Sequence, residues 1–123
     1  MTKLQAQIEQ FGQAVSRLEE VLREPASTIV RDSAIQRFEF TLDLAWKTVK
    51  TVLEERFGIV CASPKECFRE AYRQKLIEYE DYWLTMVDQR NETVHTYKEE
   101  VAEQIYRELP KALENFKKLL AVL

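Results

Sequence analysis

The chain has 123 residues, 46% of them hydrophobic, which predicts one domain large enough to bury an apolar core. Its 18 basic and 21 acidic side chains give a net charge of -3, which excludes the basic excess of a nonspecific RNA binder. With only two glycines and three prolines, the chain lacks the turns of a many-stranded sheet, so we predict an all-α protein.

Two long helices are predicted in the first half of the chain. Apolar residues recur in steps of four and three over residues 4–22, which describes one stripe of a bundle helix that Pro25 ends. A second apolar pattern begins near Val30 to Ser33, with Asp32 or Ser33 as its capping residue. Gly58 ends this helix.

The centre of the chain predicts a short third helix. Ser63 has the form of an N-cap, Pro64 of a first-turn proline, and Glu66 of the glutamate in a capping box. Cys61 and Cys67 lie beside this helix start without a second cysteine pair, which does not suit a zinc site. We therefore expect two reduced thiols.

A fourth helix is predicted from Glu80, and a last one ends near Leu120. Residues 96–99 have the form of a capping box, which predicts a helix break near Tyr97. Pro110 predicts a kink in the last helix. The spacing that leads from the fourth helix to the break defines one core stripe: Trp83, Met86, Val87, Arg90, Val94 and Tyr97.

These elements predict an antiparallel up-and-down four-helix bundle with an additional short helix, as a single domain over residues 1–123. No apolar run approaches the ~18 residues of a membrane-spanning helix. The N-terminal segment is polar and does not have the pattern of a secretory leader. We expect a soluble, cytoplasmic protein without a membrane contact.

Four groups that can touch a phosphate fall within residues 90–97: the guanidinium of Arg90, the carboxamide of Asn91, the imidazole of His95 and the phenol of Tyr97. If this stretch is helical, Asn91 and His95 share a face. Arg90 stands where the pattern asks for a hydrophobic residue, and burying its charge is costly unless it is paired or opens into a polar cleft. The placement favours a functional site.

This set of groups suits cleavage of RNA without a metal or a cofactor. The reaction needs a base, an acid and a cation, and an imidazole, which titrates near ~6.5, suits either proton role. Because His95 is the only histidine, a twofold homodimer that brings two copies into one cleft would supply acid and base together. Asn91 could orient the imidazole or contact a phosphate oxygen.

Structural alternatives exist for each of these residues. Arg90 could form a buried ion pair with Asp43 or Glu39, and Asn91 could cap a broken helix. His95 could be a capping or packing residue, and Tyr97 could be plain core. Four aromatic residues are expected in the core or at a dimer contact rather than as a platform for stacked bases: Phe38, Phe40, Trp46 and Trp83.

Three segments carry a resemblance to a known family: residues 33–47 (SAIQRFEFTLDLAWK), Ser63-Pro64, and residues 83–97 (WLTMVDQRNETVHTY). They resemble the nucleotidyltransferase substrate-binding proteins of the HEPN superfamily. The family motif is an arginine, a polar residue, three further residues, a histidine and, two positions later, a tyrosine. The matching residues are Arg90, Asn91, His95 and Tyr97.

The resemblance implies a small helical homodimer that works with a minimal nucleotidyltransferase. In one version it is a toxin whose Arg90 and His95 cleave RNA without metal, and the partner is an antitoxin that transfers AMP to Tyr97. In the other version it is a non-catalytic subunit that binds the nucleotide or other substrate of a two-component nucleotidyltransferase. The chain has no Gly-Ser dipeptide, so nucleotidyl transfer is expected in the partner and not in this chain.

Overall fold

The computed structural model describes all 123 residues and contains five α-helices, one 3₁₀ turn and no strand. The predicted all-α helical bundle is confirmed. None of its helices combines the length and the apolar character that crossing a membrane requires. The elements in chain order are α1 (Lys3–Leu22), α2 (Thr28–Phe57), α3 (Pro64–Arg73), α4 (Glu80–Glu92), η1 (Thr93–His95) and α5 (Glu99–Val122).

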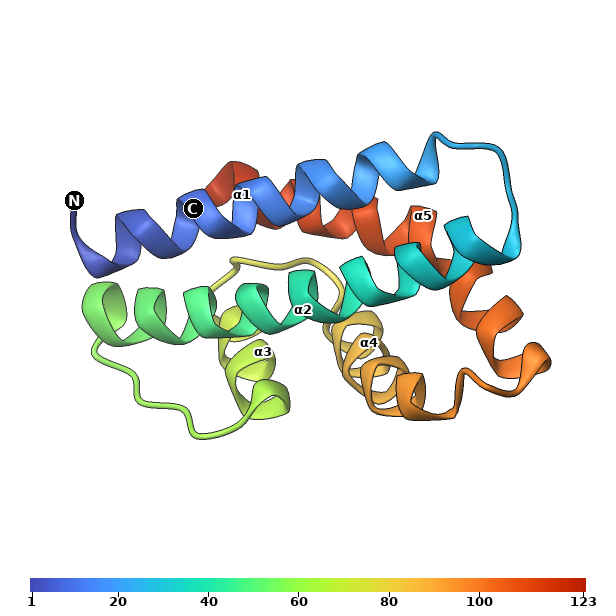
Figure 1. Cartoon of the computed structure of the whole chain (residues 1–123). Helices are drawn as coiled ribbons and strands as arrows, with labels where there is room; N and C mark the ends of the chain where they lie inside the picture. Colours follow the sequence, from blue (N-terminus) through green and yellow to red (C-terminus); the bar gives the residue numbers. More distant parts are fainter.

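The helices form two groups, which meet at α2. Figure 1 shows the long helices α1, α2 and α5 lying lengthwise beside one another, and all three contact each other. The shorter helices α3 and α4 lie next to each other on the other side of α2 and are directed across it (Figure 1). The end of α4 and the turn that follows it are therefore held between α2 and the start of α5.

A cluster of aromatic rings joins the two groups. The Phe116 ring lies 6.1 Å from that of Phe11, 6.2 Å from that of Phe38 and 5.7 Å from that of Trp83, measured between centroids. Trp83 also packs on Phe68 of α3, with 4.8 Å between the ring centroids. All five side chains are buried. The predicted core positions of Phe38 and Trp83 are confirmed, and these contacts fix α4 against α2 and α5.

The second helix begins earlier than the sequence pattern predicts. Ser27 is its N-cap, and its hydroxyl accepts a hydrogen bond from the backbone N–H of Val30 at 3.1 Å. The expectation that Asp32 or Ser33 caps this helix is wrong, because both lie inside it and the Asp32 carboxylate is bound by the side chain of Arg31. The predicted end is confirmed, since Gly58 has the left-handed conformation (φ 66°) that favours glycine at a helix end.

The third helix has the predicted cap. The Ser63 hydroxyl accepts a hydrogen bond from the N–H of Glu66 at 3.3 Å, and Pro64 is the first helical residue. The Glu66 carboxylate reaches back to the N–H of Ala62, at 3.0 Å, rather than to that of Ser63. This contact turns the preceding segment back alongside the first turn of α3.

The two cysteines are joined by a disulfide, so the expectation of reduced thiols is wrong. The segment that turns back at Ala62 brings the Cα atom of Cys61 to 5.2 Å from that of Cys67, and both side chains are buried. This separation lies within the usual range for a disulfide. Spacing along the chain could not predict the bond, because the reversal depends on the contact of Glu66 with Ala62.

Candidate functional site

The four motif residues lie at a helix junction, as predicted. Arg90 and Asn91 belong to the last turn of α4, which ends at Glu92, and His95 is the last residue of η1. Tyr97 follows in the connection to α5. The motif is therefore not one continuous α-helix, and the helical relation between Asn91 and His95 does not hold.

The change to a 3₁₀ turn shifts which residues face the core. Thr93 is buried, whereas the predicted core residues Val94 and Tyr97 are 68% and 76% exposed. The Thr93 hydroxyl donates a hydrogen bond to the Arg90 carbonyl at 2.7 Å, and the Thr93 carbonyl accepts one from the Thr96 hydroxyl at 3.0 Å. A 3₁₀ turn has three residues per turn, so the core stripe of α4 does not continue through it.

Thr93 is the residue that the sequence reasoning missed. Its side-chain hydroxyl bonds a backbone carbonyl in the last turn of α4. Threonine side chains often bond nearby backbone groups in this way and so compete with the hydrogen bonds of a helix. The available signal was a β-branched hydroxyl residue three positions after Arg90, just before the predicted break. Thr93 connects the part of the site that carries Arg90 to the part that carries His95.

Arg90 does not form a buried ion pair. Its side chain is 40% exposed, and the Nη1 atom approaches a carboxylate oxygen of Glu39 only to 3.9 Å. The alternative partner, Asp43, instead accepts hydrogen bonds from Trp46 Nε1 at 3.1 Å and Lys47 Nζ at 2.9 Å. A long contact at such exposure contributes little to stability. The guanidinium donors of Arg90 are thus accessible to a ligand.

Arg90 and Asn91 line a cavity of about 270 Å³ between α2, the start of α3 and α4. Asp43 and Trp46 of α2 form the facing side, and Pro64 contributes from α3. The two aromatics were expected in the core or at a dimer contact; Trp46 is half-buried and packs against the core, whereas Phe40 is 39% exposed and is not a core residue. Their contact with a second chain stays a prediction.

His95 and Tyr97 form a separate exposed pair beyond the cavity. Their ring centroids lie 6.1 Å apart with 66° between the ring planes, and both side chains are exposed. The ammonium of Lys98 lies 5.9 Å from the centroid of the Tyr97 ring. The interpretations of His95 as a packing residue and of Tyr97 as plain core are wrong. Both side chains are accessible to a substrate or to another protein.

The predicted capping box at the start of the last helix is also wrong. Lys98 is the N-cap of α5 and makes no side-chain cap hydrogen bond. The hydroxyl of Thr96 instead bonds the Thr93 carbonyl, and the Glu99 carboxylate binds Arg31 of α2. The helix break near Tyr97 is confirmed, but a contact between distant parts of the chain replaces the local cap.

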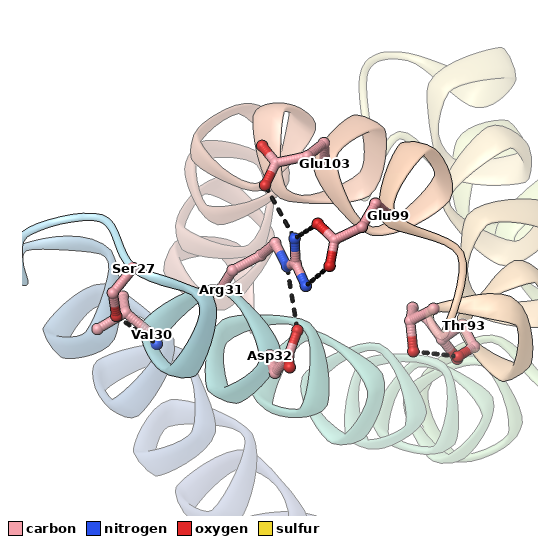
Figure 2. Close-up of polar contacts among 8 residues, drawn as sticks. Ser27, Val30, Arg31, Asp32, Thr93, Glu99 and Glu103 are labelled. Atoms are coloured by element: carbon pink, nitrogen blue, oxygen red, sulfur yellow. Dashed lines mark hydrogen bonds and ion pairs between the residues drawn. The ribbon is translucent and has the colours of Figure 1, made fainter.

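Arg31 anchors the start of α5, directly after the motif. Its side chain is only 5% exposed, and Figure 2 shows the guanidinium between carboxylates of both helices. Arg31 Nη1 donates to Glu99 at 2.6 Å and to Glu103 at 3.0 Å, and Nε donates to Asp32 at 3.0 Å. These hydrogen bonds, that with Glu99 foremost, raise the pKa of Arg31, and the bond from Arg31 lowers the pKa of Glu99 below its ordinary value of 4.5.

Replacing Arg31 by methionine should lower the melting temperature at neutral pH. A carboxylate whose pKa is lowered on folding contributes stability that is present above its unfolded pKa, here 4.5, and is lost as the pH falls through its folded value. The difference in melting temperature between wild type and Arg31→Met should therefore shrink in acid. Thermal unfolding at pH 7 and at successive values below 4.5 measures it.

Arg23→Met is the matched control for this experiment, because Arg23 is 74% exposed and meets Glu19 only at 3.6 Å. It should change the melting temperature little at any pH. A deficit of Arg31→Met that stays constant down to strongly acidic pH would contradict the assignment to the carboxylate pairs.

A family model described as "Nucleotidyltransferase substrate binding protein like" matches residues 6–123 of the chain. The chain belongs to this family. The nucleotidyltransferase substrate-binding family inferred from the motif is thereby confirmed. Family membership covers nearly the whole chain, including the cavity and the exposed pair.

The chain is similar to a curated protein, the probable ribonuclease HepT of Haemophilus influenzae. The two are 36% identical over 90 residues, which is 67% of this chain and 62% of the relative. The match thus spans less than two thirds of that protein.

Two solved structures share the fold. A crystal structure of a Thermus thermophilus protein has a TM-score of 0.86 and 38% identity, over 90% of this chain and 96% of that one. A tri-AMPylated HEPN toxin of Shewanella oneidensis, in complex with its MNT antitoxin, has a TM-score of 0.79 over 99% of this chain and 97% of that one. Its identity is 19%, so this second likeness concerns the fold alone.

Proposed function

We propose that this protein is a HEPN toxin that cleaves RNA without a metal, acts as a homodimer, and is neutralised by transfer of AMP to Tyr97. The observation that carries the proposal is the exposure of the motif at the end of α4. Arg90 has no close ion-pair partner, and His95 is exposed in the next turn. The relative named as a ribonuclease supports the same reaction class.

In the proposed reaction, the two histidines of a dimer have opposite proton roles. His95 of one chain takes the proton of the 2′-hydroxyl while the oxygen of that hydroxyl forms a bond to phosphorus. His95 of the second chain, as imidazolium, donates a proton to the 5′-oxygen while the bond between phosphorus and that oxygen breaks. The products are a 2′,3′-cyclic phosphate and a free 5′-hydroxyl. Arg90 stabilises the charge on the phosphorane, and Asn91 contacts the substrate beside it.

AMP transfer would place a new charge beside this machinery. The Tyr97 oxygen attacks the α-phosphorus of ATP bound by the partner nucleotidyltransferase, pyrophosphate leaves, and a base of the partner takes the phenolic proton. The 76% exposure of Tyr97 makes this oxygen reachable. The AMP phosphate is negatively charged and can bind the guanidinium of Arg90, which is then not available to the RNA phosphate. A nucleotidyltransferase in complex with a HEPN toxin of the same fold supports the choice of partner.

Arg90→Ala should lower the rate of RNA cleavage in EDTA by about 10²- to 10³-fold, because a donor aimed at the developing phosphorane charge is lost. Arg90→Lys should recover only part of it, since an ammonium lacks the bidentate fork. Gel analysis of end-labelled RNA measures both. Arg69→Ala on α3, an exposed arginine without an ion pair, is the control and should cleave at the wild-type rate. Unchanged cleavage by Arg90→Ala would contradict the proposal.

The alternative function is a non-catalytic substrate-binding subunit of a two-component nucleotidyltransferase. Its specific support is the family description, together with a cavity that Arg90 and Asn91 line and His95 does not. Under this alternative the pure protein leaves RNA intact, and Arg90→Ala impairs nucleotidyl transfer by the partner instead.

A further inference from the structure

The cavity beside Arg90 has the size and the walls of a site for one flat ring system. Its volume of about 270 Å³ lies below the ~300–1,000 Å³ of sites for drug-sized ligands. Leu42 and Val87 supply aliphatic wall, and the indole of Trp46 supplies an aromatic surface. The hydrogen bond from Trp46 Nε1 to Asp43, at 3.1 Å, holds the indole in place. Rings and apolar walls of this kind receive unstacked nucleobases.

The polar rim of the cavity is specific in its donors and acceptors. The Asp43 carboxylate accepts one hydrogen bond on each oxygen, from Trp46 and from Lys47. A carboxylate has about four acceptor positions, so each oxygen keeps one. Asn91 also lines the cavity and carries an amide that can donate. The rim thus offers two neighbouring acceptors on Asp43 and an amide donor on Asn91, beside the guanidinium of Arg90.

Guanine is the nucleobase that complements this rim. Its pairing edge presents two neighbouring N–H donors and one carbonyl acceptor, whereas adenine, cytosine and uracil each present donors at only one position of that edge. Arg90 lies on the same rim and is the group that we place on the phosphate. A base in the cavity would therefore be joined to a phosphate at Arg90.

We infer that the cavity between α2, α3 and α4 is a guanine-recognition subsite, in which Asp43 and Asn91 read the base and Trp46 packs on it. The role of this subsite rests on the proposed function: if the protein cuts RNA, it cuts beside guanosine. The binding site itself exists whether or not the protein cuts RNA, so nucleotide binding and cleavage are measured separately.

Calorimetric titration of the wild-type protein with guanosine 3′- and 5′-monophosphate tests the site, with the adenosine, cytidine and uridine compounds alongside. At least one of the two guanosine monophosphates should bind about tenfold or more tightly than the adenosine, cytidine and uridine compounds. The bases of those compounds leave an acceptor of Asp43 unpaired. Asp43→Asn should remove most of this preference, since its amide presents a donor to the guanine N–H groups. Equal binding of all four bases, or no binding, would overturn the inference.

Two controls locate the ligand. Glu55→Gln removes an exposed carboxylate of the same helix that makes no ion pair, and the guanine preference should persist. Guanosine monophosphate should also change the tryptophan fluorescence of the wild type, and this change should be lost in Trp46→Phe, because Trp83 is buried in the core. A fluorescence change that persists in Trp46→Phe would place the ligand elsewhere.

Mapping the cut sites on an RNA of mixed sequence separates the two proposals. Cleavage beside guanosine that Asp43→Asn redistributes to other bases supports both of them. Cleavage without base preference retains the ribonuclease and rejects the guanine subsite. Guanine-selective binding by a protein that leaves RNA intact retains the subsite and rejects the ribonuclease.

Discussion

His95→Ala is expected to lower the rate of RNA cleavage by about 10²- to 10⁴-fold, the usual contribution of a positioned general acid or base. His95 is the only histidine, so no neighbouring imidazole can replace it. Its side chain is exposed at the end of η1, and removal leaves the core contacts intact. The rate should therefore fall without a change in the melting temperature. Cleavage of end-labelled RNA in EDTA and thermal unfolding of the same preparations measure the two quantities.

The proposed homodimer allows a second test of the role of His95. If one site uses the histidines of both chains, a mixed dimer of wild type and His95→Ala is inactive. Co-refolding equal amounts of the two chains gives roughly a quarter wild-type dimers, so the activity per wild-type chain should fall to about half. Co-refolding with Glu92→Gln, an exposed neighbour of the motif, should leave that activity unchanged. Full activity per wild-type chain in the first mixture would show that one chain suffices and would contradict the composite site.

Tyr97→Phe is expected to abolish AMP transfer by the partner nucleotidyltransferase, because the phenolic oxygen is the proposed acceptor. Intact-mass analysis after incubation with the partner and ATP should show added AMP on wild type and none on the variant. Tyr79 and Tyr72 are 56% and 44% exposed and serve as internal controls. Tyr79→Phe and Tyr72→Phe should be modified like wild type. Modification of Tyr97→Phe would reject the assignment of the acceptor.

The same modification should also stop RNA cleavage, if AMP neutralises the protein as proposed. Wild-type protein should lose RNA cleavage once it carries AMP, because the nucleotide phosphate competes for Arg90. Tyr97→Phe should keep cleaving after the same incubation. If fully modified wild type still cleaved RNA at the full rate, AMP transfer would not neutralise the protein, which would contradict this part of the proposal.

The helix pattern was accessible from the sequence because its signals are local. The stripe of residues 4–22, the left-handed Gly58 and the Ser63-Pro64 start each depend on residues within a few positions, and all three are confirmed. The burial of Trp83 followed from the same spacing. The motif residues were picked out by their chemistry and spacing, and their functional roles stay a prediction.

Side-chain contacts overruled the expected helix pattern at three places, and one of these contacts joins distant segments of the chain. Glu99 has the form of a capping-box residue, but Arg31, 68 positions away, binds its carboxylate. Thr93 bonds the end of α4 and turns Val94 and Tyr97 outward. The return of the segment before α3 joins Cys61 to Cys67. In each case a side chain found a partner that periodicity cannot encode.

The order and type of the helices, and the identity of the groups that can touch a phosphate, were readable from the chain alone. Helical periodicity and side-chain chemistry are properties of short segments. The cavity that brings Asp43 and Trp46 of α2 to Arg90 and Asn91 of α4 was decided by tertiary packing. It depends on how the helices pack around the buried rings of Phe116 and Trp83. The physical reason is that a site between helices is set by the shape of their shared core, which no single helix specifies.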